Sequence, residues 1–189
     1  NHMKLFYQLL SILVLVAFAA CEKVENKVLF EGGTAPNLVA STSTVRLQPG
    51  EEANTAIRFT WTNPDYKLNT GLSSHDVKYK LEIDTVGGQF NSSNKFSETF
   101  SKTLATSYTV GQMNSLFGNT MLLQLGREYT FQVRVVASLG TNSDIQPISS
   151  NILTFKATPF APPPKVAPPA VGELFITGAA TPGNWMGSG

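Results

Sequence analysis

The sequence predicts an all-β protein whose main unit is an immunoglobulin- or fibronectin-III-like antiparallel β-sandwich over residues 34–158. Three observations support this fold class. Short segments alternate apolar and polar residues with the period of a strand. Turn residues separate these segments at regular intervals. Hydrophobic residues make up 42 % of the chain and charged residues only 14 %, which is enough apolar material for a core between two sheets.

The N-terminal segment has the layout of an export signal. Two residues that we interpret as a cloning scar precede Met3, and Lys4 supplies a positive charge. From residue 9 to 20 the only polar residue is Ser11. A helix of that length would rise about 18 Å, which is too short for a hydrocarbon core of about 30 Å. Residues 1–20 are therefore predicted to be the scar followed by a signal peptide.

Cys21 is the single cysteine of the chain, so a disulfide within the chain is excluded. The segment Phe18-Ala19-Ala20-Cys21 resembles the lipobox of bacterial lipoproteins, and a charged, polar segment follows it. An ordinary signal peptidase site with an unmodified cysteine and a buried core cysteine are the alternatives. The charged segment favours lipid attachment at Cys21, with acyl chains that anchor the mature protein. Residues 21–33 are then a lipidated tether.

Two strands are predicted most clearly. In TAIRFTWT, Ile57, Phe59 and Trp61 face one way, and we expect Trp61 to be buried between the sheets with Phe59. In VKYKLEID the apolar residues are Val77, Tyr79, Leu81 and Ile83. The charged residues of this second strand are Lys78, Lys80, Glu82 and Asp84. This alternation predicts a half-buried strand with its charged face in water.

The remaining elements follow in order along the chain. EYTFQVRVVAS carries Tyr129, Phe131, Val133 and Val135 on one face, and NILTFKATPF is a last strand ended by Pro159. Weaker strand candidates are NLVAS, TVRLQ, FSETFSK and SYTVG. Met113, Leu116 and Phe117 have helical spacing, which predicts a short helix between strands.

The C-terminal part changes composition. Residues 159–172 contain six prolines, which favours a semi-rigid polyproline II linker. An SH3-type ligand is the alternative for such a segment. Residues 173–189 are interpreted as the truncated start of a second domain followed by a linker scar, because a strand pattern and then a turn follow the prolines.

Charge argues against nucleic-acid binding. The formal net charge is +1, and without residues 1–20 the acids and bases balance. No block of like charges is present in the sequence, whereas phosphate binding needs a basic patch. A nucleic-acid partner is therefore not expected.

No pattern of a catalytic site is recognised, so the chain is predicted not to be an enzyme. His75 lies between Ser74 and Asp76, and neighbours in sequence point apart rather than converging as in a triad. Glu82 and Asp84 would lie about 7 Å apart on one face of a strand, a separation that a glycosidase pair can have. With lysines beside them, we expect both carboxylates to stay ionised on a solvated face.

No metal or cofactor is predicted. The residues of an Asx-rich loop that offer oxygen ligands for Ca²⁺ are Asn63, Asp65 and Asn69. Their spacing matches no EF-hand. A structural zinc site would need a cluster of His and Cys that this sequence lacks.

The order of motifs resembles the SusE-type lipoproteins of the outer membrane. The motifs are the segment at Cys21, FTWTNPDY, VKYKLEID, GREYTFQVRV with SNILTFKATPF, and LFITGAATPGNW. The resemblance implies a lipid-anchored protein on the cell surface, in a polysaccharide-uptake system with SusC- and SusD-type partners. It implies that the sandwich is a spacer, that residues 173–189 are the truncated start of a carbohydrate-binding module, and that such later modules bind starch or another glycan. Trp185 then belongs to such a module, or equally to a core that this chain does not complete.

The sandwich itself is expected to bind no polysaccharide. Its strands place their aromatic residues inward, and only Tyr66, Phe90 and Phe160 fall in loops or at element ends, where they are scattered. A lipid-anchored adhesin or pilus-type structural protein with stacked sandwiches is the alternative function.

Overall fold

A computed structural model of the protein describes residues 3–4, 27–140 and 144–161. In these ranges the chain forms short strands and one helical segment. The strands are β1 (Phe30–Gly32), β2 (Val39–Ala40), β3 (Thr44–Val45), β4 (Thr55–Thr60), β5 (Lys67–Leu68), β6 (Gly71–Leu72), β7 (Val77–Thr85), β8 (Phe96–Ser101), β9 (Ala105–Thr109), β10 (Tyr129–Leu139), β11 (Ile145–Ser149) and β12 (Leu153–Ala157). The helical segment consists of α2 (Val110–Ser115) and a π-helical turn, η1 (Leu116–Thr120).

The strands form a sandwich of two main sheets and a small third sheet. The larger main sheet has the order β3-β12-β10-β7-β8, with β11 also pairing with β10, and the smaller has the order β2-β4-β9. The predicted all-β sandwich is confirmed. One pairing departs from the antiparallel prediction, because β3 runs parallel to β12. The chain leaves the smaller sheet after β2 and joins the larger one at β3, so a single edge segment serves both sheets.

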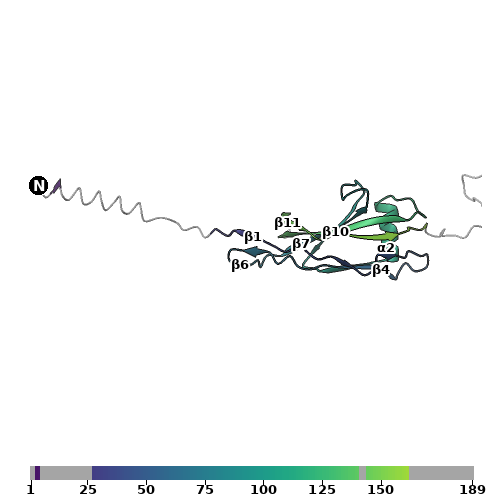
Figure 1. Ribbon diagram of the computed structural model, residues 1–189, viewed down its shortest axis with the longest axis horizontal. Helices are drawn as coiled ribbons and strands as arrows, with labels where there is room; N and C mark the ends of the chain where they lie inside the picture. Colours follow the sequence, from purple (N-terminus) through teal and green to yellow (C-terminus); the bar gives the residue numbers. More distant parts are fainter. Residues whose placement is uncertain (1–2, 5–26, 141–143, 162–189) are drawn as a thin grey trace, which may run out of the picture.

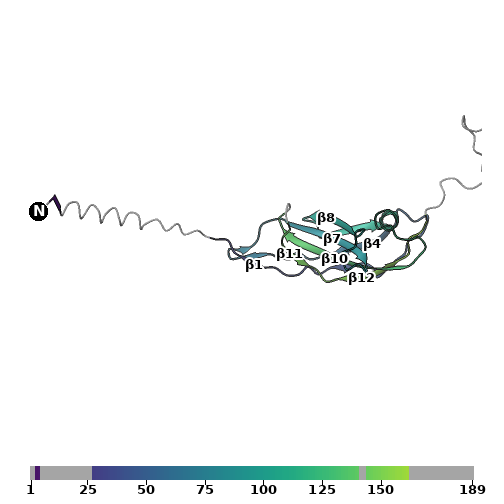
Figure 2. The same cartoon turned by 90° about the horizontal axis from the view of Figure 1, so that it is seen from above.

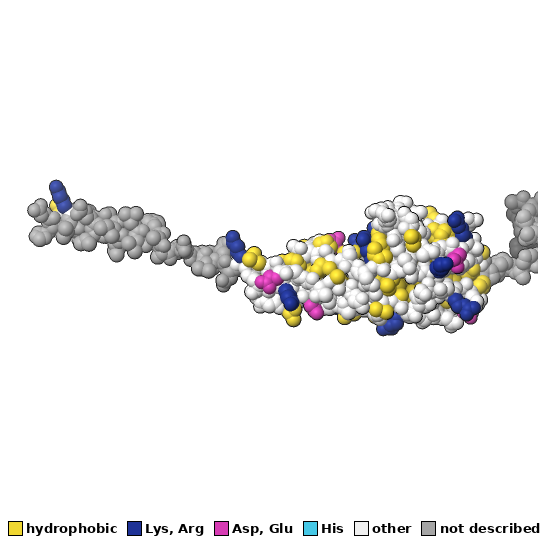
Figure 3. Space-filling view, in the orientation of Figure 1, with side chains coloured by type: hydrophobic (Ala, Val, Ile, Leu, Met, Phe, Trp, Pro, Cys, Tyr) yellow, Lys and Arg dark blue, Asp and Glu magenta, His cyan; other side chains and the backbone are white. Residues whose placement is uncertain are grey.

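The described part of the molecule is elongated, and its two ends carry different elements. The small sheet β1-β5-β6 lies at one end, and α2 lies at the other, beside the end of β12 (Figures 1 and 2). On the face shown in Figure 3, apolar side chains form small scattered groups between charged and other polar atoms. No helix in the described residues is both long and apolar enough to cross a bilayer.

Most elements lie where the sequence pattern places them, but four were not predicted. β5, β6 and β11 are short strands in segments whose composition is typical of turns, and β1 lies inside the range 21–33 predicted as tether. β1 forms because Phe30 pairs with Leu68 of β5 and its ring packs 5.7 Å from that of Tyr66. A strand of three residues has too short an alternation to be recognised from sequence.

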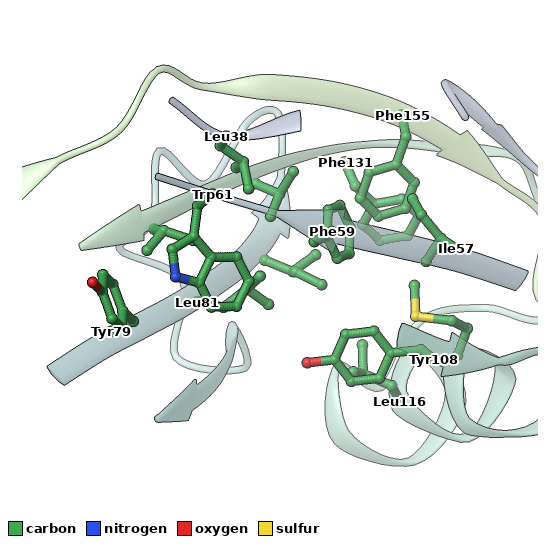
Figure 4. Packing of buried hydrophobic residues seen from close by; sticks show 14 of the residues in the cluster. Leu38, Ile57, Phe59, Trp61, Tyr79, Leu81, Tyr108, Leu116, Phe131 and Phe155 are labelled. Atoms are coloured by element: carbon green, nitrogen blue, oxygen red, sulfur yellow. The ribbon is translucent and has the colours of Figure 1, made fainter. Parts of the chain in front are cut away.

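The core lies between the two main sheets and is closed at one end by the helical segment. Phe59 of β4 is 0 % exposed and Trp61, just after β4, is 4 % exposed, so their predicted burial is confirmed. The indole of Trp61 packs against Tyr79, with ring centroids 5.9 Å apart (Figure 4). Phe117 from η1 stacks on Phe131 of β10 at 4.1 Å. The helical segment therefore covers one end of the core.

The local sequence explains where the helical segment begins. Thr109 caps α2, because its hydroxyl accepts a hydrogen bond from the backbone N–H of Gln112, and the Gln112 side chain accepts from the N–H of Thr109. This reciprocal pair is a capping box. The predicted helix carrying Met113, Leu116 and Phe117 is confirmed, and all three side chains are buried.

Candidate functional site

The two site residues named from the sequence lie outside the described residues. Cys21 belongs to the segment 5–26, and Trp185 belongs to the segment 162–189. Lipid attachment at Cys21 and sugar contact by Trp185 therefore remain predictions. The candidate sites that the structure does describe are the loop around His75, the Asx-rich loop, the charged face of β7 and the surface hollows.

The loop around His75 brings no catalytic partners together. His75 is exposed, and its backbone N–H donates to the hydroxyl of Ser73 at 3.2 Å. Asp76 instead pairs with Lys102, whose Nζ lies 3.0 Å from a carboxylate oxygen. Within the described ranges, no three side chains of His, Cys, Asp or Glu are grouped so that they could hold a metal ion.

In the Asx-rich loop, the side chains of Asn63 and Asn69 form hydrogen bonds with the backbone, so their oxygen atoms are already used as acceptors. The side-chain oxygen of Asn63 accepts from the backbone N–H of Asp65 at 3.2 Å, which is an Asx-turn. The side-chain oxygen of Asn69 accepts from the N–H of Leu29 at 3.0 Å, and its amide group donates to the carbonyl of Lys27 at 2.9 Å. A Ca²⁺ site in this loop gains no support from the arrangement.

The charged face of β7 is not the solvated face that its alternation predicts. Glu82 and Asp84 are each only 1 % exposed. Glu82 lies directly opposite Arg134 of β10, and the guanidinium contacts its carboxylate at 2.7 and 2.8 Å. Both contacts of Arg134 are with Oε2 of Glu82. Lys95 donates to Oε1 at 3.0 Å, and the Nζ atom of Lys80 lies 3.7 Å from Oε1. The prediction of a wet face is wrong for these two acids.

The cover over this face is the connection between β7 and β8. Phe90 in that connection is 3 % exposed, and the guanidinium of Arg134 lies 4.2 Å from the centre of its ring. Lys95 also donates to the carbonyl of Phe90 at 2.8 Å, so one ammonium group bridges the loop and the buried acid. Gly88 lies so close to the side chains of Asp84 and Ser92 that a Cβ at this position would clash with both. A larger residue at position 88 would therefore have to displace the side chains of Asp84 and Ser92.

The surroundings of Glu82 keep its carboxylate ionised. Burial acts to raise its pKa, but the hydrogen bonds from Arg134 and Lys95 and the positive charges of Arg134 and Lys80 outweigh burial, so the pKa lies below its ordinary value. A general acid needs a raised pKa. Because both carboxylate oxygens are already engaged, Glu82 is suited to holding the cover loop in place and not to proton transfer.

The aromatic residues offer no platform for a sugar in the described ranges. Every aromatic side chain there is buried or half-buried. Tyr66 is 2 % and Phe90 is 3 % exposed, so the loops do not leave these two in solvent, while Phe160 is half-buried. The Tyr66 hydroxyl donates to the carbonyls of Ala137 and Gln146, each 2.9 Å away, and burial raises the pKa of Tyr66 to about 12.

One hollow of about 410 Å³ lies where β8, β9 and α2 meet. Phe96 and Tyr108 line it, together with residues of α2 and η1. The hydroxyl of Tyr108 donates to the carboxylate of Glu98, so this polar pair already satisfies itself. Burial, reinforced by that carboxylate, raises the pKa of Tyr108, which keeps the phenol neutral. The hollow holds no activated nucleophile or base.

Two sequence signals could have indicated the covered face of β7. Gln132 and Arg134 alternate with the apolar residues of the next strand, so a cation was available opposite the acids. In addition, Phe90 stands alone in a polar, glycine-containing connection, where a large apolar residue needs a place to pack. Neither signal identifies its partner, because register between strands 50 residues apart is not written in the local pattern.

Comparison with models of known protein families gives a match. A family model described as SusE outer membrane protein matches residues 23–136, which include most of the sandwich. No protein in a collection of curated proteins matches the chain.

Proposed function

Because the chain belongs to the SusE outer membrane protein family, we propose that its sandwich is the N-terminal spacer of a lipid-anchored surface protein in a polysaccharide-uptake system. In this proposal Cys21 carries the lipid anchor on the outer face of the outer membrane. Glycan is bound by modules that follow residue 172, and the partners are SusC- and SusD-type proteins of the same system. The sandwich itself has no enzymatic role.

The observation that supports a spacer is the position of the two chain ends. The first described strand, β1, lies at one end of the elongated domain, and the chain leaves after β12 at the other end (Figures 1 and 2). A domain with this layout separates whatever precedes it from whatever follows it by its full length. A sandwich whose chain ends lay side by side would add little separation.

The sequence distance to the proposed anchor is short. Six residue steps separate Cys21 from Lys27, where the described domain begins. A fully extended chain spans at most about 3.4 Å per residue, so this tether reaches no more than about 20 Å. The end with β1 would therefore stay near the membrane, while the end with α2 would point away from it.

The chemistry of the described surface also supports a spacer over a sugar-binding domain. Sugar rings stack on exposed aromatic faces that have polar groups beside them. Every aromatic side chain of the described ranges is at least half-buried, and nine of them, including Trp61 and Phe90, form part of the buried set. Binding by later modules is consistent with the motif around Trp185.

Affinity electrophoresis tests the proposal. This chain and a chain extended past Trp185 into complete modules are run side by side in gels that contain starch or other glycans. We expect retardation only for the extended chain. Equal retardation of both would show that the sandwich binds sugar and would overturn the spacer assignment. Failure of both to bind any glycan in a broad panel would favour the adhesin or pilus alternative.

The anchor is tested in cells. Cys21→Ala should release the protein from the membrane fraction, and the mass of the mature protein should show acyl chains at Cys21. An unmodified thiol at Cys21 in the membrane-bound protein would contradict the proposed attachment.

A further inference from the structure

Several asparagine side chains in the described domain fix nearby backbone segments. Each of them accepts a hydrogen bond from a backbone N–H and donates one to a backbone carbonyl. Asn114 of α2 donates to the carbonyl of Phe160 at 2.9 Å and accepts from the N–H of the same residue at 2.8 Å. Phe160 follows β12 and is next to the last described residue at this end, Ala161. The place where the chain leaves the sandwich is therefore fixed to α2.

A second contact reinforces this end. The backbone N–H of Gly126 donates to the carbonyl of Pro159 at 2.6 Å. Phe160 and Leu125 both line one hollow, together with residues of α2. Two consecutive residues, Pro159 and Phe160, are thus held by the turn before β10 and by α2. The predicted proline-rich linker begins directly at this fixed point.

The opposite end of the domain has a similar arrangement. The side chain of Asn69, in the turn between β5 and β6, accepts from the N–H of Leu29 and donates to the carbonyl of Lys27. The backbone N–H of Asn69 in turn donates to the carbonyl of Leu29 at 2.9 Å. Three hydrogen bonds from one residue therefore fix the first residues of the described domain.

A third pair shows the same chemistry inside the domain. Asn151 accepts from the N–H of Leu38 at 2.7 Å and donates to its carbonyl at 3.0 Å. An asparagine amide carries one acceptor and a donor group in a plane, so it can pair with a residue as a neighbouring strand would. Such a pair fixes both the position and the orientation of the backbone that it contacts.

We propose that Asn69 and Asn114 are positioning residues that fix the directions in which the chain joins and leaves the sandwich. This inference rests on the proposed spacer function and adds that the spacer is a rigid strut with fixed ends. A proline-rich segment is semi-rigid, so a direction set at Phe160 is carried along it. Without the contact at Asn114, Gly126 would still hold Pro159, but the chain would pivot from Phe160 onward, and the following module would sample many orientations.

Distances between two spin labels test the role of Asn114. The full 189-residue chain carries Cys21→Ser, so that labels attach only at Thr99→Cys on β8 and at Gly172→Cys, just past the prolines. We expect a narrow distance distribution in this chain. Asn114→Ala should broaden the distribution at least two-fold, because both hydrogen bonds to Phe160 are lost.

Two further variants separate positioning from general stability. Asn119→Ala is the matched control, because Asn119 lies in the adjoining η1 and its side chain donates to Ser115 at 3.0 Å, with no hydrogen bond to Phe160 among the described residues. It should leave the distribution unchanged. Asn114→Asp keeps an acceptor for the N–H of Phe160 and loses the donor to its carbonyl, so its distribution should be intermediate. Thermal unfolding of all three variants shows whether the sandwich stays folded at the measuring temperature.

Asn69 is tested in the same way, with the label at Gly172 moved to Glu22→Cys. Asn69→Ala should broaden the distance distribution from Thr99 to this label. Equal distributions in the parent chain and in Asn114→Ala, both folded, would overturn the inference for the C-terminal end. That result would leave the gel comparison of glycan binding untouched, so failure of the strut is distinguishable from failure of the spacer function.

Discussion

The two faces of β7 differ in chemistry, although both are buried in their middle part. The inner face carries Tyr79, Leu81 and Ile83, each at most 1 % exposed, in the apolar core. The outer face carries Glu82 and Asp84, also 1 % exposed, under the connection between β7 and β8. The inner face of β7 is thus stabilised by burial of apolar surface, and its outer face is stabilised by ion pairs and hydrogen bonds to the buried acids.

This difference shows what alternation can and cannot predict. A period of two separates the faces of a strand, and it correctly assigned every inward residue of β7. It does not say whether the second face meets water or another part of the chain. Here a ten-residue connection folds back over the polar face, and its Phe90 provides the apolar cover while Lys95 provides the charge.

The largest expected effect comes from the inner face. Trp61→Ala should lower the free energy of unfolding by about 3–5 kcal/mol, the usual range for truncating a buried aromatic. Trp61 packs against Tyr79 of β7 and Phe100 of β8, with centroids 5.9 and 5.6 Å apart. Urea unfolding measures the change, and a loss below about 1 kcal/mol would mean that this part of the core is held by other contacts.

Trp61→Phe is the matched control for that prediction. The indole N–H of Trp61 is buried and has no hydrogen-bond partner among the described residues. Replacement by phenylalanine removes this unsatisfied donor and keeps most of the ring contact. Its cost should therefore be much smaller than that of Trp61→Ala.

Removing a charge from the outer face of β7 should lower the free energy of unfolding by less than Trp61→Ala does. Glu82→Gln removes the charge that Arg134 and Lys95 share, and we expect a loss of about 1–3 kcal/mol in the free energy of unfolding. The loss stays below that of a fully buried pair because these two cations are 29 % and 31 % exposed and reach water. On the same strand, Lys78 pairs with the exposed Asp144 at 2.8 Å, and Asp144→Asn should leave the midpoint of unfolding unchanged. If Glu82→Gln and Asp144→Asn changed the free energy of unfolding equally, burial of Glu82 would not strengthen its ion pairs.

The smallest expected effect is a pH dependence of the free energy of unfolding, which arises from Glu82 on the outer face of β7. The pKa of Glu82 lies below its ordinary value of 4.5 in the folded protein. A depressed pKa contributes stability above the unfolded pKa, and that contribution is lost as pH falls through the folded pKa. The difference in stability between the parent protein and Glu82→Gln should hold from about pH 7 to pH 5.5 and shrink below about pH 4.5. A difference that stays constant down to about pH 3 would show that the charge of Glu82 does not cause it.

The sandwich class and most of the long strands were predictable from the order of residues along the chain. Alternation is a property of the extended backbone, so a single strand such as β10 displays its buried face without knowledge of its neighbours. The helix with Met113 and Phe117 was predictable for the same reason, since its period and its cap are local. The order of motifs along the chain was also enough to indicate the family, because such an order is a property of the sequence alone.

The burial of particular polar groups and the contacts of the asparagines that hold the chain ends depend on how the two sheets pack, so local patterns did not predict them. Glu82 meets Arg134 across 52 positions of sequence, Asn114 meets Phe160 across 46, and Asn151 meets Leu38 across 113. The loop composition around Asn69 suggests a possible calcium ligand, yet its partners are the backbone groups of Lys27 and Leu29. The physical reason is that a hydrogen bond or ion pair depends on distance in space, and folding brings these groups together only through the packing of the two sheets.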